Sequence, residues 1–228
     1  IVNGLKELHI DMAQVEGIFI SHEHSDHIAG LQQLLKRFDI PVYTKQGTWR
    51  EIQDKLVVPK NQLIELTKGS LSLGNLIVEP FAVSHDAADP IGINVFSGKD
   101  KATVVTDTGI ISDDILHRID DSTLLVLEAN YDPHMLRFGP YQPFLKQRVD
   151  SDEGHLSNEM AAQALLMMKR PDFMQVILAH RSENNNNAVL VTQTIGKMLV
   201  DGGVRIGPEM KLQHGQPNEI VSMQSIKR

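Results

Sequence analysis

Apolar residues along the chain follow two periods, which predict short strands alternating with helices. Residues 27–38 place their apolar side chains three and four positions apart, on one helical face. Ser112 stands where an N-cap residue is favoured and predicts a short helix. Ser157 predicts a longer helix that ends before Pro171, and a final helix is expected over about 187–200.

Short β-branched runs separate these helices and predict strands. The runs fall at residues 41–44, 63–66, 73–79, 80–84, 91–97, 101–106, 123–128 and 176–178. Because strands and helices alternate without an internal repeat or a linker-like segment, we expect a single α/β domain over residues 1–228.

The composition is that of a globular protein, with 41% hydrophobic and 22% charged residues among 228. No apolar stretch has the length of a membrane span, and no leader is recognised. Cysteine is absent, so any metal must be held by His, Asp or Glu, and a reducing, cytoplasmic location is expected. The net charge of −7 disfavours broad nonspecific binding to nucleic acid but allows a local basic patch.

The densest chemistry lies in the loop from Ser21 to His27, which follows an apolar run. The loop supplies three imidazoles and the Asp26 carboxylate. Nitrogen and oxygen donors at this spacing suit divalent transition metals. Without an ion, so many polar groups in one loop would leave unpaired atoms. The loop therefore predicts a metal site with ligands at His22, His24, Asp26 and His27.

Three further donors follow predicted strands and complete the candidate ligand set. They are His85, Asp107 and His180. Taken singly, each would fit a structural role at the end of an apolar strand. Together with the first loop they indicate a second coordination sphere, because one loop alone cannot enclose two ions.

The order of these residues resembles the metallo-β-lactamase superfamily. The resemblance implies an αβ/βα sandwich with the site along one edge, and two divalent ions, either Zn²⁺, Mn²⁺ or Fe²⁺. The implied ligands are His22, His24 and His85 for one ion and Asp26, His27 and His180 for the other, with Asp107 as the bridge. An aspartate bridge without cysteine is similar to the phosphodiesterase and nuclease branches.

A second motif adds catalytic candidates. The segment Gly154–Asn158 resembles an element of the ribonuclease Z group, in which a histidine paired with a glutamate contacts the scissile phosphate. By this resemblance His155 and Glu128 form that pair. A histidine kept protonated by a carboxylate can give a proton to a leaving oxygen. The alternative is that His155 only organises the start of the helix capped by Ser157.

Longer stretches are similar to the YycJ (WalJ) family of bacterial metallo-hydrolases. They are residues 128–132, 139–141, 145–148, 154–158 and 180–185. The resemblance implies a 5′-to-3′ exonuclease acting on DNA. Members of the family begin with a strand hairpin and an aspartate-bearing strand ahead of a first helix. Here that helix is expected from Val2 to about Gln14, so the first strands are expected to have been left out.

The expected mechanism uses a hydroxide that bridges two ions about 3.5–4 Å apart, with Asp26 as a catalytic ligand. Lys146, Arg148 and Arg181 are candidates for contacts with substrate phosphates. Acidic residues at 150–153 leave open that the first two lie in a solvated loop. Tyr141 is expected to pack against the chain rather than stack on a base.

Three alternatives are left open. A small-molecule phosphodiesterase acting on cyclic phosphates would use the same ligands. A thioester hydrolase of the glyoxalase type would give no reason for pairing His155 with Glu128. A non-catalytic scaffold would be expected to lose ligands, whereas all seven are present.

Overall fold

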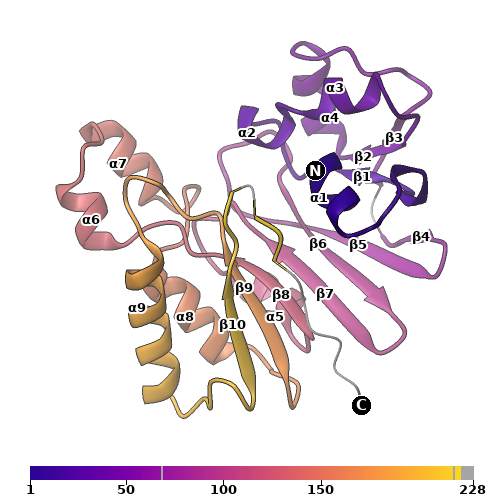
Figure 1. Cartoon of the computed structure of the whole chain (residues 1–228). Coiled ribbons are helices and arrows are strands. Elements are labelled where there is room, and N and C mark those ends of the chain that lie inside the picture. Colours follow the sequence, from indigo (N-terminus) through magenta and orange to yellow (C-terminus); the bar gives the residue numbers. More distant parts are fainter. Residues whose placement is uncertain (68, 218, 222–228) are drawn as a thin grey trace.

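The strands form two sheets in the computed structural model, which describes residues 1–67, 69–217 and 219–221 (Figure 1). Within those residues the small sheet is parallel, with the order β1 (Ile18–Phe19), β2 (Val42–Thr44) and β3 (Leu63–Glu65). The large sheet has the order β10-β9-β8-β7-β6-β5-β4. Its strands are β4 (Leu71–Leu73), β5 (Leu76–Ala82), β6 (Ile91–Ser97), β7 (Asp100–Val105), β8 (Leu124–Glu128), β9 (Met174–Ala179) and β10 (Met210–His214). The strands from β7 to β10 run parallel, and those from β4 to β7 are antiparallel.

The helices fall into three groups according to their place in the fold. The first group is α1 (Val2–Glu7), the 3-10 helix η1 (Met12–Gln14), α2 (Ser25–Ile28), α3 (Leu31–Leu35) and α4 (Gln46–Gln53). The helices α5 (Asp113–Ile119), α8 (Asn158–Met167) and α9 (Ala188–Asp201) pack on the large sheet. The helices α6 (Pro133–Phe138) and α7 (Pro143–Val149) project to one side (Figure 1). Within the described ranges no helix is long and apolar enough to cross a bilayer.

Alternating side chains divide the core into layers. Ile18 and Val42 face the helices of the first group, whereas Phe19 and Tyr43 stack at 4.9 Å and pack toward Ile91 of the large sheet. The opposite face of the large sheet is covered by α5, α8 and α9 through the largest buried cluster. Two sheets packed face to face with helices outside confirm the predicted αβ/βα sandwich.

The predicted strands are largely confirmed, but β1 and β4 were not predicted, and the strand expected over 73–79 includes the turn between β4 and β5. One further error is instructive. Residues 73–79 and 80–84 were expected as two strands, but β5 runs without a break through Pro80. The neighbouring strand β4 pairs with β5 only as far as Val78. Pro80 therefore lies where one edge of β5 has no strand partner among the described residues, and there its missing N–H costs no ladder bond.

The predicted helices are less accurate than the strands. The helix expected over 27–38 is interrupted at Gly30, and the helix expected from Val2 ends at Glu7. The helices α4, α6 and α7 were not predicted. Lys146 and Arg148 lie on α7, so the alternative that they lie in a solvated loop is wrong.

Candidate metal centre and catalytic site

The loop after β1 is anchored to the connection between β5 and β6. The Ile91 amide donates to the Ser21 carbonyl oxygen at 3.1 Å, and the Ala88 amide donates to Glu23 Oε1 at 2.8 Å. The β5–β6 connection also carries His85. These contacts therefore bring the predicted ligands of the first loop close to His85, which is distant in the sequence, without the help of an ion.

Three imidazole nitrogens converge at this junction. His24 Nδ1 lies 3.1 Å from His22 Nε2 and 3.2 Å from His85 Nε2. His85 Nδ1 faces the carbonyl oxygens of Glu153 and Gly154 at 3.1 Å each, so its proton lies on Nδ1 and Nε2 presents a lone pair. His24 Nδ1 carries at most one proton, so it cannot donate a hydrogen bond to both His22 Nε2 and His85 Nε2. A tetrahedral ion with bonds of about 2.05 Å would hold its ligands about 3.3 Å apart, so the group fits a cation.

Asp26, His27 and His180 form a second group. Asp26 Oδ2 lies 3.5 Å from His27 Nε2 and 3.7 Å from His180 Nε2. His180 Nδ1 lies 2.7 Å from Glu128 Oε1, which places a proton on Nδ1 and leaves Nε2 for the group. A carboxylate behind the far ring nitrogen is typical of imidazoles that bind metals.

Asp107 lies between the two groups and is buried. Its Oδ2 lies 3.4 Å from His27 Nε2, and its Oδ1 lies 3.8 Å from His85 Nε2. Oδ2 makes no hydrogen bond to any part of the chain that the structure describes. A buried carboxylate oxygen that accepts no hydrogen bond is costly unless a cation is near, so Asp107 suits a position between the two groups.

Adjacent parallel strands deliver three of the site residues. Asp107 follows β7, Glu128 ends β8 and His180 follows β9. The carboxyl ends of parallel strands lie at one edge of a sheet, where ligand sites are common. Asp107 and His180 have φ angles of 57° and 50°, in the left-handed region. Non-glycine residues there are strained and tend to cluster at functional sites.

Glu128 is fully buried and uses both carboxylate oxygens. Oε1 accepts from His155 Nδ1 at 2.8 Å and from His180 Nδ1 at 2.7 Å. Oε2 accepts from the amides of Thr108 and Leu156 at 3.2 and 3.1 Å. Sequence reasoning paired Glu128 with His155 alone; the structure adds His180, so one carboxylate orients both imidazoles.

Burial and neighbouring charges set the protonation of these histidines. Burial, with the nearby His27, lowers the pKa of His22 to about 3, and burial also lowers the pKa of His85. Burial opposes the charged form of His180, but hydrogen bonds to Asp26 and Glu128 outweigh it and raise its pKa to about 11. His22 and His85 are therefore neutral and ready to bind a metal, whereas a cation would displace one proton from His180.

A pocket of about 300 Å³ opens beside the second group. His155, His180, Arg148, Arg181 and Tyr141 are among its lining residues. The structure thus brings two of the three basic candidates to the site, and Tyr141 packs as expected. Lys146 is not among the described residues that line this pocket, and its Nζ donates to the Arg137 carbonyl oxygen at 2.8 Å.

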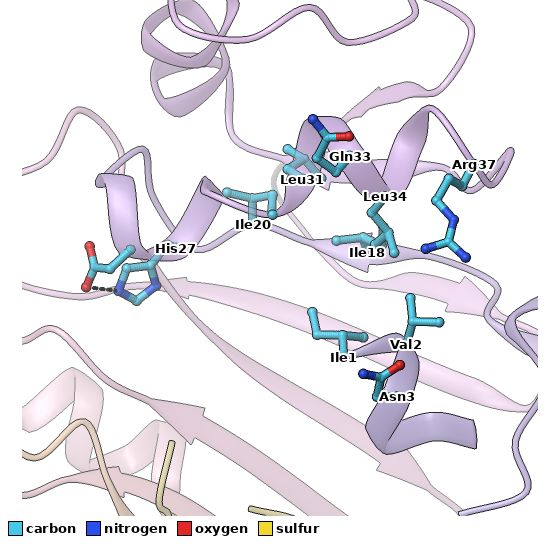
Figure 2. A pocket seen from close by; sticks show the side chains of 12 residues that line it. Ile1, Val2, Asn3, Ile18, Ile20, His27, Leu31, Gln33, Leu34 and Arg37 are labelled. Atoms are coloured by element: carbon cyan, nitrogen blue, oxygen red, sulfur yellow. Dashed lines mark ion pairs between the residues drawn. The ribbon is translucent and has the colours of Figure 1, made fainter. Parts of the chain in front are cut away.

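A second pocket, of about 550 Å³, opens beside Asp26 and His27. Figure 2 shows His27 at one end and Arg37 at the other, with Ile18 and Leu34 between them. The two pockets share no lining residue. The lining of the second pocket is polar at the two ends and mainly apolar between them.

Two supporting residues escaped the sequence analysis. Arg148 NH2 donates to Asp86 Oδ1 at 2.9 Å, and Asp86 Oδ1 lies 3.5 Å from His85 Nε2. Asn130 Nδ2 donates to the His180 carbonyl oxygen at 2.8 Å. Asp86 directly follows a predicted ligand, which was the available signal. Asn130 lies in the stretch 128–132 that carries the family resemblance, but no role was assigned to it.

The sequence is similar to proteins of known name along nearly its whole length. The family model described as "Beta-lactamase superfamily domain" matches residues 4–180. Exodeoxyribonuclease YycJ of Bacillus anthracis is 33% identical over 223 residues, which are 97% of this chain and 84% of that protein. Exodeoxyribonuclease WalJ of Streptococcus pneumoniae is 30% identical over 231 residues, 99% of this chain and 86% of that protein. The metallo-beta-lactamase fold protein YhfI of Bacillus subtilis has a TM-score of 0.64 at 15% identity over 86% of this chain and 74% of its own, a likeness of fold.

Proposed function

Because the chain belongs to the beta-lactamase superfamily, we propose that it is a dinuclear phosphodiester hydrolase that degrades DNA from the 5′ end. Family membership and the two exodeoxyribonuclease relatives support a metal-dependent hydrolase and confirm the resemblance to the YycJ (WalJ) family. The same relatives disfavour a non-catalytic scaffold. The substrate, the number of ions and the direction of digestion are our proposals.

Two three-residue groups would hold the ions. The first is His22, His24 and His85, the second is Asp26, His27 and His180, and Asp107 would touch both. When bound, divalent ions lower the pKa of water and neutralise charge on phosphoryl oxygens. Nitrogen and carboxylate donors suit Zn²⁺, Mn²⁺ and Fe²⁺ alike.

His155 is the proposed general acid. Its Nδ1 donates to the buried Glu128 carboxylate, so Nε2 is the ring nitrogen left to face the departing oxygen, and the proposed acid is the doubly protonated ring. The ring centroid of His155 lies 5.1 Å from that of His85 and 5.3 Å from that of His180. The proton donor therefore lies next to ligands of both groups.

The observation that carries this proposal is the buried Oδ2 of Asp107, which accepts no hydrogen bond from the described residues and lies between two sets of candidate metal-ligand atoms. Asp107→Ala and His24→Ala should each abolish Mn²⁺-dependent cleavage of labelled oligonucleotides while the circular dichroism spectrum is retained. Oligonucleotides labelled at the 5′ or the 3′ end report the direction of digestion. The matched control is His117→Ala, because the His117 side chain is 79% exposed and lies outside the site. Full activity of both ligand variants would exclude the mechanism.

A second candidate is a small-molecule phosphodiesterase acting on cyclic phosphates. The pocket of about 300 Å³ beside His155 and His180 favours it, because this volume suits a small ligand. Purified protein should be given a cyclic nucleotide and labelled DNA in parallel. Turnover of the cyclic nucleotide alone would favour this second function.

A further inference from the structure

The segment 133–149, which we name the α6–α7 arm, has a charge opposite to that of the whole chain. It contains Arg137, Lys146 and Arg148 and no acidic residue, whereas the chain has 29 acidic and 22 basic residues. Its helices project beside the site (Figure 1). An acidic protein that concentrates positive charge on one projection has a local surface suited to a polyanion.

The arm also exposes two aromatic rings. Phe138 and Phe144 are 68% and 72% exposed, and every other Phe, Tyr and Trp in the described residues is at least partly buried. Arg137 lies over the Phe138 ring, 5.5 Å from its centroid. Leaving a Phe in water forgoes roughly 1.5–3 kcal/mol of burial, so the pair suggests a partner surface.

These rings are exposed although the arm has a core of its own. Leu136 and Val149 are buried against Tyr131, and Tyr141 and Leu145 pack on them. Phe138 and Phe144 lie outside this cluster. The arm is therefore a packed element that exposes the two rings on its outer face.

Two hydrogen bonds hold the arm together, and one ion pair ties it to the site. At its base, Tyr131 OH donates to Asp150 Oδ1 at 2.6 Å. Lys146 joins the two helices through the Arg137 carbonyl oxygen. Arg148 makes a two-contact ion pair with Asp86, next to the metal-ligand groups. The arm is thus braced against the site.

We propose that the α6–α7 arm binds the single-stranded part of a DNA substrate, with Phe138 and Phe144 stacking on bases and Arg137 contacting phosphate. Exposed aromatic rings among basic residues are the usual platform for single strands, because every base has a face on which to stack. The surface leads to the site, since Tyr141, Leu145 and Arg148 line the pocket that contains His155. This inference rests on the proposed nuclease function and names the part of the molecule that recognises the strand.

The test measures binding separately from cleavage. A fluorescein-labelled oligothymidylate is titrated with the full protein in EDTA, and anisotropy gives Kd. The variant Phe138→Ala/Phe144→Ala should raise Kd by at least about tenfold. Arg137→Gln should reduce the slope of log Kd against log salt by about 0.7. The matched control is Met167→Ala/Val200→Ala, which removes two side chains of 67% and 59% exposure outside the arm.

The outcomes separate the two proposals. A Kd within twofold of the unaltered protein for the Phe138/Phe144 variant would overturn the role of the arm, as would an unaltered protein that binds no strand. An equal loss in the control variant would also overturn it. Hydrolysis of an aryl phosphodiester with Mn²⁺ tests the proposed function independently. DNA binding that depends on Phe138 and Phe144, together with no hydrolysis of the aryl phosphodiester, would support the role of the arm and refute the proposed nuclease function.

Discussion

Replacing His155 by alanine should reduce turnover strongly without unfolding the protein or removing its metal. Glu128 Oε1 would still accept from His180 Nδ1 at 2.7 Å, so no buried charge loses its last partner. One hydrogen bond to a charged group is lost, which bounds the fall in the free energy of unfolding at about 1.5–3 kcal/mol. Loss of a general acid lowers kcat by about 10²–10⁴.

The leaving group decides between acid catalysis and a structural role. Departure of a DNA alkoxide needs a proton, whereas departure of a nitrophenolate does not. The loss in kcat for His155→Ala should therefore be much larger on oligonucleotides than on an aryl phosphodiester. Equal losses on both substrates would refute the assignment of His155 as an acid.

Metal content checks the competing assignment of His155 as a ligand. Atoms of Asp107, Glu128, His155 and His180 lie within 4.8 Å of one another and could themselves hold an ion. Elemental analysis of His155→Ala should match that of the unaltered protein. Loss of an ion would identify His155 as a ligand, and the acid role would be withdrawn.

Two further predictions concern the metal groups and their surroundings. Chelation should lower Tm by about 5–10 °C for each ion removed, because an ion present at 100 times its Kd stabilises the fold by about 2.7 kcal/mol. Re-addition of Zn²⁺ or Mn²⁺ should restore the Tm, and an unchanged Tm would argue against these sites. Asp86→Asn should weaken metal binding severalfold in a titration, because the carboxylate lies 3.5 Å from His85 Nε2, yet lower the free energy of unfolding by no more than about 1 kcal/mol, because its pair with Arg148 is partly exposed.

The sequence revealed the site better than its surroundings for a physical reason. The candidate ligands of the first loop lie within six consecutive residues, so their spacing is visible without a fold. His85, Asp107 and His180 each follow an apolar strand, and strands of this kind are recognisable from their β-branched residues. Once strand ends are expected at one sheet edge, the convergence of these three residues follows.

The α6–α7 arm could not be predicted in the same way. Its helices have 6 and 7 residues, too few for an apolar period to stand out. They begin at Pro133 and Pro143 and are held by the buried Leu136 and Val149. Such contacts come from tertiary packing, so the sequence alone left open that Lys146 and Arg148 lie in a solvated loop.

The precision of the site comes from backbone geometry that the sequence does not encode locally. A residue in an ordinary β conformation after β7 or β9 would continue the strand's alternation, but Asp107 and His180 turn into the left-handed region. Such conformations cost of order 1–3 kcal/mol each and persist only where surrounding contacts over-determine them. Here the central strand β8 supplies those contacts, since Glu128 Oε1 binds His180 and Oε2 binds the Thr108 amide beside Asp107. The buried Glu128 carboxylate therefore binds His180, His155 and the residue next to Asp107. The alignment of the candidate ligands thus depends on the same side chain as that of the candidate acid.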